Sequence, residues 1–507
     1  MSAAAQPVEY DLIIIGGGIN GCGIARDAAG RGLKVLLLER DDLAGATSSA
    51  SSKLIHGGLR YLEQYEFRLV REALAERALL LRNAPHLVHP LTFILPHVEG
   101  MRPAWMIRAG LWLYDWLGGP SPLPRSSAIS LRDSSYGSAL RPEFERGFRY
   151  ADCWVDDARL VVENAKAAAQ RGATILTRTA CVLAARDAAG WSVTARSSVD
   201  GEQSEFRARA LINAAGPWAQ EVLQRVLNTA SPARLQLVKG SHIVVPRLYQ
   251  GDHAYILQNQ DRRVVFAIPY EQRFTLVGTT EAPQSQPAAV SISPEETEYL
   301  CRAVSRYFAQ PLSPSAVVWS YAGIRPLYDD GGSNVSQVTR DYVLQLDGAP
   351  NAAPVLSIFG GKITTYRRLA ERALESLRAY FPAMGPCWTA SAMLPGGDLP
   401  GADLSQFTAQ LASQRPGIPL EALAGMVRRY GALIGQVLGD ATSLADMGGH
   451  FGAGLTEREI DYLVEREWAA GADDILWRRT KCGLHMSLEQ RAAVAAYFKT
   501  NHCNNLR

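Results

Sequence analysis

Residues 10–39 read YDLIIIGGGINGCGIARDAAGRGLKVLLLE, and this stretch decides the fold of the chain. It begins with YDLIII (10–15), a continuous apolar run typical of parallel strands that are covered on both faces. A glycine-rich turn follows, then small residues that predict a helix to about Gly30, then a second apolar run, KVLLL (34–38). Strand, helix and strand in this order predict a βαβ unit, which opens a doubly wound α/β sheet.

The turn carries the spacing G-x-G-x-x-G at Gly16, Gly18 and Gly21. In dinucleotide-binding folds these glycines permit a tight turn, close approach of the backbone to a pyrophosphate, and close packing of helix on strand. The first turn of the helix also offers free N–H groups to the phosphates. We therefore expect a bound dinucleotide; the alternative is a glycine-rich turn without a ligand.

Glu39 follows the second strand, where an acidic side chain can accept hydrogen bonds from ribose hydroxyls. The place of this motif in the chain does not distinguish FAD from NAD. The next segment, ATSSASSKLIHGGLRYLE (46–63), is dense in small hydroxyl residues, which suit a backbone that lies along a flavin. The alternative for this segment is a serine-rich surface loop.

The rest of the chain alternates between helical and strand-like patterns until about residue 395. The predicted helices lie at 64–83 and at about 157–171, the strand-rich regions at 173–215 and 235–319, and another strand–helix pair at 354–380. After Pro395-Gly396-Gly397 only helical periodicity remains. We place a domain boundary there, because proline and glycine end regular elements.

Length and composition exclude several classes of protein. A chain of 507 residues is too long for one ordinary core, and a net charge of +2 gives no reason to expect nucleic acid as a partner. The seven cysteines show no CxxC spacing, so we expect neither a zinc site nor a disulfide framework, which fits a reducing cytoplasm. We expect no signal peptide and no membrane-spanning segment.

The motifs, taken together and in order, are similar to those of the aerobic, FAD-dependent glycerol-3-phosphate dehydrogenases, which belong to the D-amino-acid-oxidase-like flavoproteins. The motifs that carry this resemblance are GGGINGCGIARDAAGRGLKVLLLE (16–39), TSSASSKLIHGGLRYLE (47–63), CWVDDARLV (153–161), NAAGPW (213–218), KGSHIVVP (239–246), YILQN (255–259), GIRPL (323–327), TRDY (339–342), FGGKITTYR (359–367) and WRRTKCGL (477–484). The chain has Ala215 where the family often has Thr, and it lacks the D-x-D-x-D-G calcium loop of eukaryotic relatives.

The resemblance implies an α/β fold of three parts. A Rossmann-like FAD-binding domain is drawn from about residues 8–75, 150–235 and 320–385. An antiparallel-sheet substrate domain (76–149 and 236–319) is interleaved with it and covers the flavin. An all-helical domain (396–507) follows, and WRRTKCGL is expected to dock it onto the FAD-binding domain.

The resemblance also implies oxidation of sn-glycerol 3-phosphate to dihydroxyacetone phosphate, with a hydride leaving C2 for N5 of FAD. A phosphate monoester needs cations in fixed geometry, which arginine and lysine supply. Arg60, Arg325 and Lys362 lie inside family motifs beside glycine or proline, and we expect at least two of them to hold the phosphate. The alternative for each is a solvated charge or a structural ion pair.

The C2 hydroxyl must lose a proton, and histidine has a suitable pKa for this task. His242 is the candidate base, with Tyr61 as a hydrogen-bond partner to the same hydroxyl. The alternative for His242 is a core residue bonded to a backbone carbonyl. His56 is the competing candidate for the base. The expected FAD-binding residues are Gly16, Gly17, Gly18, Asn20, Gly21, Glu39, Arg40, Thr47, Ser48, Ser49, Ser52, Lys53, Leu54, His56, Gly57, Gly58, Ala215, Gly216, Gly323, Arg325, Gly361, Lys362, Ile363 and Thr364; no metal is expected.

The electron acceptor implied by the resemblance is ubiquinone, with the protein peripheral on the cytoplasmic face of the membrane. One segment mixes basic and amphipathic aromatic residues as an interfacial helix does, and it contains Arg102, Trp105, Arg108, Trp112, Tyr114 and Trp116. A helix buried between domains is the alternative. The rival functions are a glycerol-3-phosphate oxidase that reduces oxygen, an amine or amino-acid oxidase, a non-catalytic flavoprotein and a soluble NAD-dependent dehydrogenase. A homodimer is one of the assembly states left open.

Overall fold

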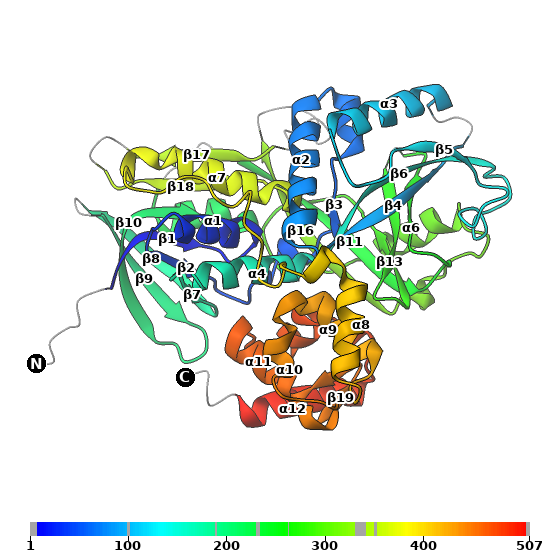
Figure 1. Ribbon diagram of the computed structural model, residues 1–507. Coiled ribbons are helices and arrows are strands. Elements are labelled where there is room, and N and C mark those ends of the chain that lie inside the picture. The colour runs from blue at the N-terminus through cyan, green and yellow to red at the C-terminus, as the bar shows by residue number, and fades with distance from the viewer. Residues whose placement is uncertain are drawn as a thin grey trace, which may run out of the picture.

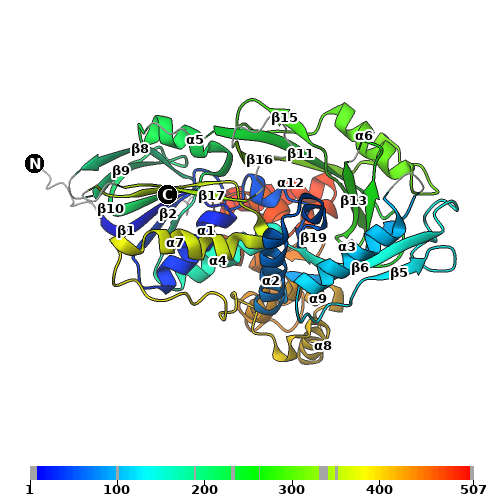
Figure 2. The same ribbon diagram turned by 90° about the horizontal axis from the view of Figure 1, so that it is seen from above.

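The computed structural model describes residues 8–98, 102–187, 190–229, 234–261, 263–329, 341–348 and 352–502, apart from the side chains of Val8, Arg60 and Ala402. Two sheets lie side by side in Figure 1, and the C-terminal segment, in orange and red, forms a helical body beneath them. Figure 2 shows the same two sheets from above, with α2 (Phe67–Asn83) at their junction.

The first sheet contains the predicted βαβ unit. Its parallel strands follow the order β18-β10-β1-β2-β7, and β17 pairs antiparallel with β18 at one edge. The hairpin of β8 and β9 adds to β10. The bounds are β1 (Val8–Ile15), β2 (Val35–Leu38), β7 (Thr174–Leu176), β8 (Thr179–Asp187), β9 (Gly190–Ser197), β10 (Gln203–Asn213), β17 (Val343–Asp347) and β18 (Val355–Phe359).

Three helices, α1 (Ile19–Gly30), α4 (Asp157–Ala169) and α7 (Tyr366–Ser376), pack together on one face of this sheet. Apolar residues of the parallel strands and the helices form one core there, so the continuous apolar runs are explained by burial on both faces. The side chain of Asp156 caps α4 by accepting from the backbone N–H of Arg159 at 3.1 Å.

The helix predicted over 64–83 begins later than expected. Leu59–Gln64 instead forms a 3-10 turn, and Tyr65 ends that turn with a φ of +59°. A left-handed residue cannot lie inside an α-helix, so α2 starts at Phe67.

The second sheet is larger and mostly antiparallel, in the order β15-β11-β14-β13-β12-β4-β6-β3, with β16 on β11 and β5 on β6. Its strands are β3 (Leu54–Ile55), β4 (Val88–Pro96), β5 (Ser127–Ser130), β6 (Arg146–Val155), β11 (Arg234–Pro246), β12 (Ala254–Gln258), β13 (Val264–Tyr270), β14 (Phe274–Gly278), β15 (Ala282–Gln284) and β16 (Trp319–Asp329). The helices α3 (Ala104–Leu117) and α6 (Pro294–Ser305) accompany it.

Three of these strands come from segments that the sequence placed mostly in the FAD-binding domain. β3, β6 and β16 pair with β6, β4 and β11, so they belong to the second sheet. Strand pairing joins residues far apart in the chain, and the sequence pattern does not report it. The junction between the two sheets therefore falls inside those segments.

The C-terminal domain contains α8 (Leu404–Gln414), α9 (Leu420–Tyr430), α10 (Ile434–Leu438), α11 (Glu457–Glu467) and α12 (Leu488–Asn501). The expectation of helices alone is corrected by a short hairpin of β19 (His450–Gly452) and β20 (Leu455–Thr456). Gly448, Gly452 and Gly454 all have positive φ there, which interrupts helical backbone.

Candidate functional site

The glycine turn after β1 has the geometry of a dinucleotide cradle. Gly16 has a φ of +114°, and a Cβ on Gly21 would lie 1.9 Å from the carbonyl oxygen of Gly16. A Cβ on Gly18 would meet the hydroxyl of Ser48 at 3.1 Å. No side chain fits at the crowded points, so backbone N–H groups at the start of α1 remain open to a pyrophosphate.

Glu39 lies at the end of β2 directly beside this turn. Its carboxylate accepts from the backbone N–H of Gly17 at 2.6 Å and from that of Asp41 at 2.8 Å. Burial raises the pKa of Glu39 above its usual value. The two N–H groups fix the side chain beside the glycine turn, as the predicted contact with a ribose requires.

The hydroxyl-rich segment after Glu39 lies between the two sheets. Ser48 accepts from the backbone N–H of Ile19 at 3.0 Å, and Thr47 donates to the carbonyl oxygen of Ile324 at 2.6 Å. At Gly323 a Cβ would lie 2.7 Å from that of Ala50. The segment therefore ties the start of α1 to β16.

Two residues of this segment use their side chains inside the protein. The ammonium of Lys53 forms an ion pair with Asp157 at 2.7 Å and donates to the carbonyl oxygen of Ser49 at 3.1 Å. The side chain of Leu54 is 4% exposed and packs in the core of the second sheet. Since the side chains of Lys53 and Leu54 are buried in the protein, these two residues would contact a cofactor through their backbone atoms.

His242 lies on β11 with its ring enclosed. Its Nε2 is 2.9 Å from the hydroxyl of Ser52, and the ring stacks on Tyr321 with the centroids 4.8 Å apart. A Cβ on Gly278 would lie 2.0 Å from the imidazole, so only glycine leaves room for it. Burial, and then the positive charges of Arg325 and Lys53, hold the pKa of His242 well below its usual value.

Arg325 lies one strand away on β16 and projects beside His242. Its guanidinium donates to the hydroxyl of Thr279 at 3.0 Å and lies 3.5 Å from a carboxylate oxygen of Glu281. About a third of the side chain remains exposed. Thr279 and Glu281 therefore orient the fork without enclosing it.

A second group of predicted residues forms around Lys362. Its ammonium lies 4.0 Å from the centroid of the Tyr61 ring, and it is close enough to His56 to lower the pKa of that residue. Burial is the larger cause of that lowering. The hydroxyl of Thr364 accepts from the backbone N–H of His56 at 3.3 Å. The side chain of Arg60, next to Tyr61, lies outside the described part of the structure.

The remaining cofactor candidates are distributed around the start of α1. The amide of Asn20 donates to the carbonyl oxygen of Gly360 at 3.2 Å, and its own oxygen is buried with no hydrogen-bond partner among the described residues. Gly361 would meet this amide if it carried a Cβ. Gly216, after β10, has a φ of +55° and open space beside it.

Three further cofactor candidates, Arg40, Gly57 and Gly58, lie against aromatic side chains of the protein. The guanidinium of Arg40 stacks over Trp218, with 4.1 Å to the ring centroid. The backbone N–H of Gly57 donates to the hydroxyl of Tyr114 at 2.8 Å. Gly58 has a φ of +75° and would clash with the Tyr61 ring if it carried a Cβ. These residues shape the chain around the site.

Sequence reasoning missed several residues that support the site. Tyr321, Thr279 and Glu281 carried no motif signal of their own. Asp157 is not among the expected site residues, yet it accepts from the Ser51 hydroxyl at 2.7 Å as well as from Lys53. The acidic pair in CWVDDARLV was the signal that could have identified it.

The segment proposed as an interfacial helix forms α3. Trp105, Trp112 and Trp116 are 70%, 61% and 67% exposed, so α3 is not buried between domains. Tyr114 is the exception to the predicted aromatic face, because its hydroxyl donates to Asp152 in the core at 2.8 Å.

Metal and membrane features were searched only within the described residues. Over those ranges no three His, Cys, Asp or Glu side chains gather in a way that could hold a metal ion. Within the same part of the chain, no helix has an apolar stretch long enough to cross a bilayer.

A glycine turn with the geometry of a dinucleotide cradle, an acidic side chain beside it and a second sheet that carries an enclosed histidine near an arginine are typical of a nucleotide-dependent oxidoreductase. The family model described as FAD dependent oxidoreductase matches residues 11–367, and that of the C-terminal domain of alpha-glycerophosphate oxidase matches residues 387–500. The chain belongs to the FAD dependent oxidoreductase family, and FAD is its cofactor. The predicted fold, FAD-binding and substrate sheets with a largely helical C-terminal domain, is confirmed.

Individual relatives agree over nearly the whole chain. A glycerol-3-phosphate dehydrogenase of Pseudomonas aeruginosa is 53% identical, covering 97% of this chain and 96% of the relative. A D-erythritol 1-phosphate dehydrogenase of Brucella abortus is 51% identical, covering 97% and 98%. The crystal structure of a glycerol-3-phosphate dehydrogenase from Bacillus halodurans complexed with FAD superposes with a TM-score of 0.75 at 26% identity, covering 97% and 94%.

Proposed function

We propose that this protein oxidises sn-glycerol 3-phosphate to dihydroxyacetone phosphate. FAD supplies the acceptor, at its N5 atom, for the hydride that leaves C2 of the substrate. The observation that carries the proposal is the closeness of His242, the proposed base, to Arg325, the proposed phosphate ligand. They lie on the paired strands β11 and β16, and His242 contacts the segment that touches the start of α1.

Arg325 binds the phosphate in this proposal. A phosphate monoester carries between one and two negative charges at neutral pH. Thr279 and Glu281 orient the guanidinium, about a third of the side chain is exposed, and arginine is well suited to bind a phosphate in a fixed geometry. Lys362 and Arg60 are the further cations of the site. Lys362 lies over the face of Tyr61 in a cation–π contact.

His242 accepts the proton of the C2 hydroxyl. Its lowered pKa keeps the imidazole neutral at neutral pH, so it is ready to take a proton. Ser52 fixes the ring through Nε2, and Tyr321 fixes its plane. Nδ1 is buried and has no partner among the described residues. Tyr61 is the second hydrogen-bond partner proposed for the same hydroxyl.

D-Erythritol 1-phosphate is the second candidate substrate, because a dehydrogenase named for it is nearly as similar to this chain as the first relative. Both compounds carry a phosphate monoester and secondary hydroxyl groups. The proposed base and phosphate ligands could act on either compound. Selectivity between the two substrates would depend on the space available for the longer carbon chain of D-erythritol 1-phosphate.

The test is an anaerobic titration of the purified holoenzyme with each compound, followed by the flavin absorption band. Glycerol 3-phosphate is expected to bleach the band with one equivalent, and a quinone analogue is expected to restore it. A band that neither compound bleaches would mean a non-catalytic flavoprotein. Bleaching by D-erythritol 1-phosphate alone would reassign the substrate.

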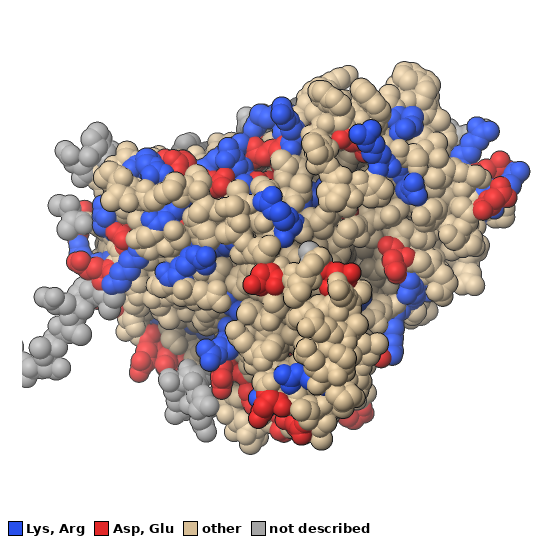
Figure 3. All heavy atoms as spheres, viewed as in Figure 1, with Lys and Arg blue, Asp and Glu red and all other residues tan. Residues whose placement is uncertain are grey.

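We propose a membrane quinone as the acceptor of the electrons, with the protein peripheral on the cytoplasmic face of the membrane. The exposed tryptophans of α3 support this, because such side chains favour the interface between lipid and water. Figure 3 shows Lys and Arg side chains, with Asp and Glu among them, over the upper part of the molecule that contains α7, α2 and α3; the basic groups would face anionic headgroups. Stoichiometric release of peroxide in air would favour an oxidase instead.

A further inference from the structure

The loop that follows Glu39 forms one wall of the dinucleotide cradle. The backbone N–H of Ala44 donates to the carbonyl oxygen of Gly17 at 3.1 Å, and Leu43 packs so closely that a Cβ on Gly17 would lie 2.9 Å from it. The loop then runs into the hydroxyl segment. Its conformation decides where Glu39 and Ser48 lie relative to the glycine turn.

Asp42, in the middle of this loop, is bound by the C-terminal domain. Arg479 donates to both of its carboxylate oxygens, at 2.7 and 2.8 Å, and Arg478 donates to one of them as well. Asp42 is 1% exposed and Arg479 is fully buried. Burial opposes the charged carboxylate, yet Arg479 holds the pKa of Asp42 below its usual value.

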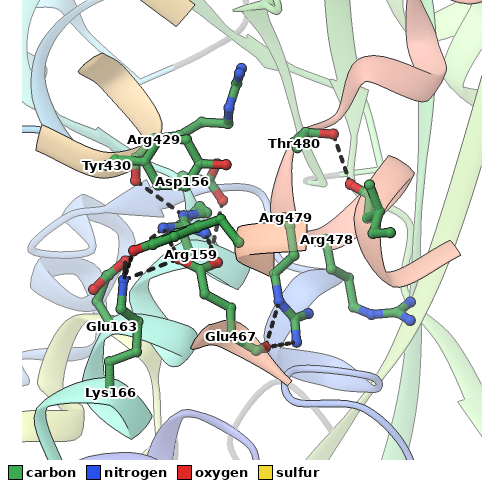
Figure 4. Close-up of polar contacts among 12 residues, drawn as sticks. Asp156, Arg159, Glu163, Lys166, Arg429, Tyr430, Glu467, Arg478, Arg479 and Thr480 are labelled. Carbon is green, nitrogen blue, oxygen red and sulfur yellow. Dashed lines mark hydrogen bonds and ion pairs between the residues drawn. The ribbon is translucent and has the colours of Figure 1, made fainter. Parts of the chain in front are cut away.

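The guanidinium of Arg479 is also held on the side away from Asp42. Its Nε and Nη2 donate to the backbone carbonyl oxygen of Glu467, at 3.2 and 2.7 Å, which Figure 4 shows as two contacts from one guanidinium. The guanidinium is therefore held on both sides. A bidentate pair of this kind sets an orientation as well as a distance.

A second contact joins the same C-terminal segment to the hydroxyl segment. Lys481 pairs with Asp156, and the adjacent Asp157 binds Lys53 and the hydroxyl of Ser51. Asp156 and Asp157 thus connect the C-terminal domain on one side and residues 51–53 on the other. Ser52, between those residues, contacts His242.

Stability alone does not account for these charges. The attraction within a buried ion pair is largely offset by the cost of removing both ions from water, so the net contribution to stability is small. The same interface already contains Arg159 between Glu163 and Glu467, with Lys166 beside them (Figure 4). Arg159, Glu163 and Lys166 all lie on α4, whereas Arg478 and Arg479 reach the loop that follows Glu39.

We propose that Arg479 is a positioning residue for FAD: through Asp42 it holds the loop that carries Glu39, so the C-terminal domain determines the affinity for the adenosine half of the cofactor. This inference rests on FAD binding and is independent of the substrate proposed above. The domain then contributes to the site without supplying a catalytic residue.

The test compares FAD release from full-length holoenzymes on dilution, read as the rise in free flavin fluorescence. Arg479→Lys keeps the charge but loses the bidentate fork, and it is expected to raise the FAD Kd by about tenfold or more. Glu163→Gln is the matched control, because it weakens a fully buried pair of the same interface, and Glu163 is bound by Arg159 and Lys166 and not by Arg479. It is expected to leave the FAD Kd within about twofold of wild type while lowering the thermal midpoint.

A double-mutant cycle with Glu39→Gln gives the readout that a merely structural role would not produce. If Arg479 acts through Glu39, the two substitutions together are expected to cost less FAD affinity than the sum of their separate effects. An unchanged Kd in Arg479→Lys, or an equal loss of FAD affinity in Glu163→Gln, would overturn the proposal. Asp42→Asn replaces Arg479→Lys if the latter does not fold, with the same outcomes expected.

Discussion

The ring of His242 stacks on that of Tyr321 with an interplanar angle of 17°, across directly paired positions of β11 and β16. The contact with Ser52 fixes one ring nitrogen, and the stack on Tyr321 also restricts rotation of the ring out of its plane. A ring held from two sides presents the same nitrogen in every turnover, which is what abstraction of a proton from a fixed hydroxyl requires.

Replacing His242 by Gln is expected to lower kcat by about 100- to 10,000-fold, the usual contribution of a positioned base. In the wild-type protein the low pKa of His242 keeps it neutral, so activity should be retained as pH falls below 6.5 and be lost only at still lower pH. A pH–rate profile checks both points. Tyr321→Phe, which keeps the stack and loses the hydroxyl bond to Ser51, is the control. A His242→Gln profile with both wild-type limbs would exclude His242 as the base.

Arg325→Gln is expected to raise the KM for glycerol 3-phosphate by about 10- to 100-fold, because hydrogen bonds to charged groups contribute about 1.5–3 kcal/mol. The same change removes a positive charge that lowers the pKa of His242. The acidic limb of the profile should therefore move to higher pH. Steady-state kinetics measures both effects, with Arg302→Gln on α6 as an exposed control. A wild-type KM would remove Arg325 from the substrate site.

Gly21→Ala is expected to abolish FAD binding. Its methyl group would lie 1.9 Å from the carbonyl oxygen of Gly16, so the turn must open and the cradle is lost. The ratio of flavin to protein absorbance after purification measures this. Gly435→Ala, where the Cβ meets nothing within 4 Å, should retain full flavin content. A yellow Gly21→Ala protein would contradict the assignment of the turn.

Charging the exposed face of α3 tests membrane contact. Trp105→Glu/Trp112→Glu should lower the fraction bound to anionic liposomes by about tenfold or more, since one large apolar side chain buried in an apolar phase contributes about 1.5–3 kcal/mol. Flotation measures the bound fraction. Leu420→Glu/Leu488→Glu, two exposed leucines of the C-terminal domain, is the matched control. Normal flotation of the tryptophan variant would exclude α3 as the anchor.

Acid should destabilise the fold through buried histidines. Burial lowers the pKa of His86 to about 3 and the pKa values of His89 and His253 to about 4. In the unfolded chain these groups bind protons near pH 6.5, so the unfolded state gains protons first as the pH falls. The free energy of unfolding should decrease between pH 6.5 and 4, by at most about 1.4 kcal/mol per pH unit for each histidine. Urea unfolding at pH 7 and pH 5 measures this, and His86→Leu should reduce the difference.

The sequence by itself determined the dinucleotide turn, the order of β1, α1 and β2, and the chemical types at His242, Arg325 and Lys362. These features are local, because a glycine spacing or an apolar run reports the conformation of its own segment. The helices of the C-terminal domain were predicted in the same way from their apolar periodicity. The hairpin at His450–Thr456 was not predicted, because glycines interrupt the helical pattern there.

Only the tertiary structure decided which distant residues meet. Tyr321 reaches His242 through strand register, Asp157 reaches Lys53 across 104 residues, and Arg479 reaches Asp42 across 437. Such contacts depend on how sheets pair and domains pack, which is set by burial summed over the whole core. No short stretch of sequence contains that information, so the partners of each charge became known only from the folded chain.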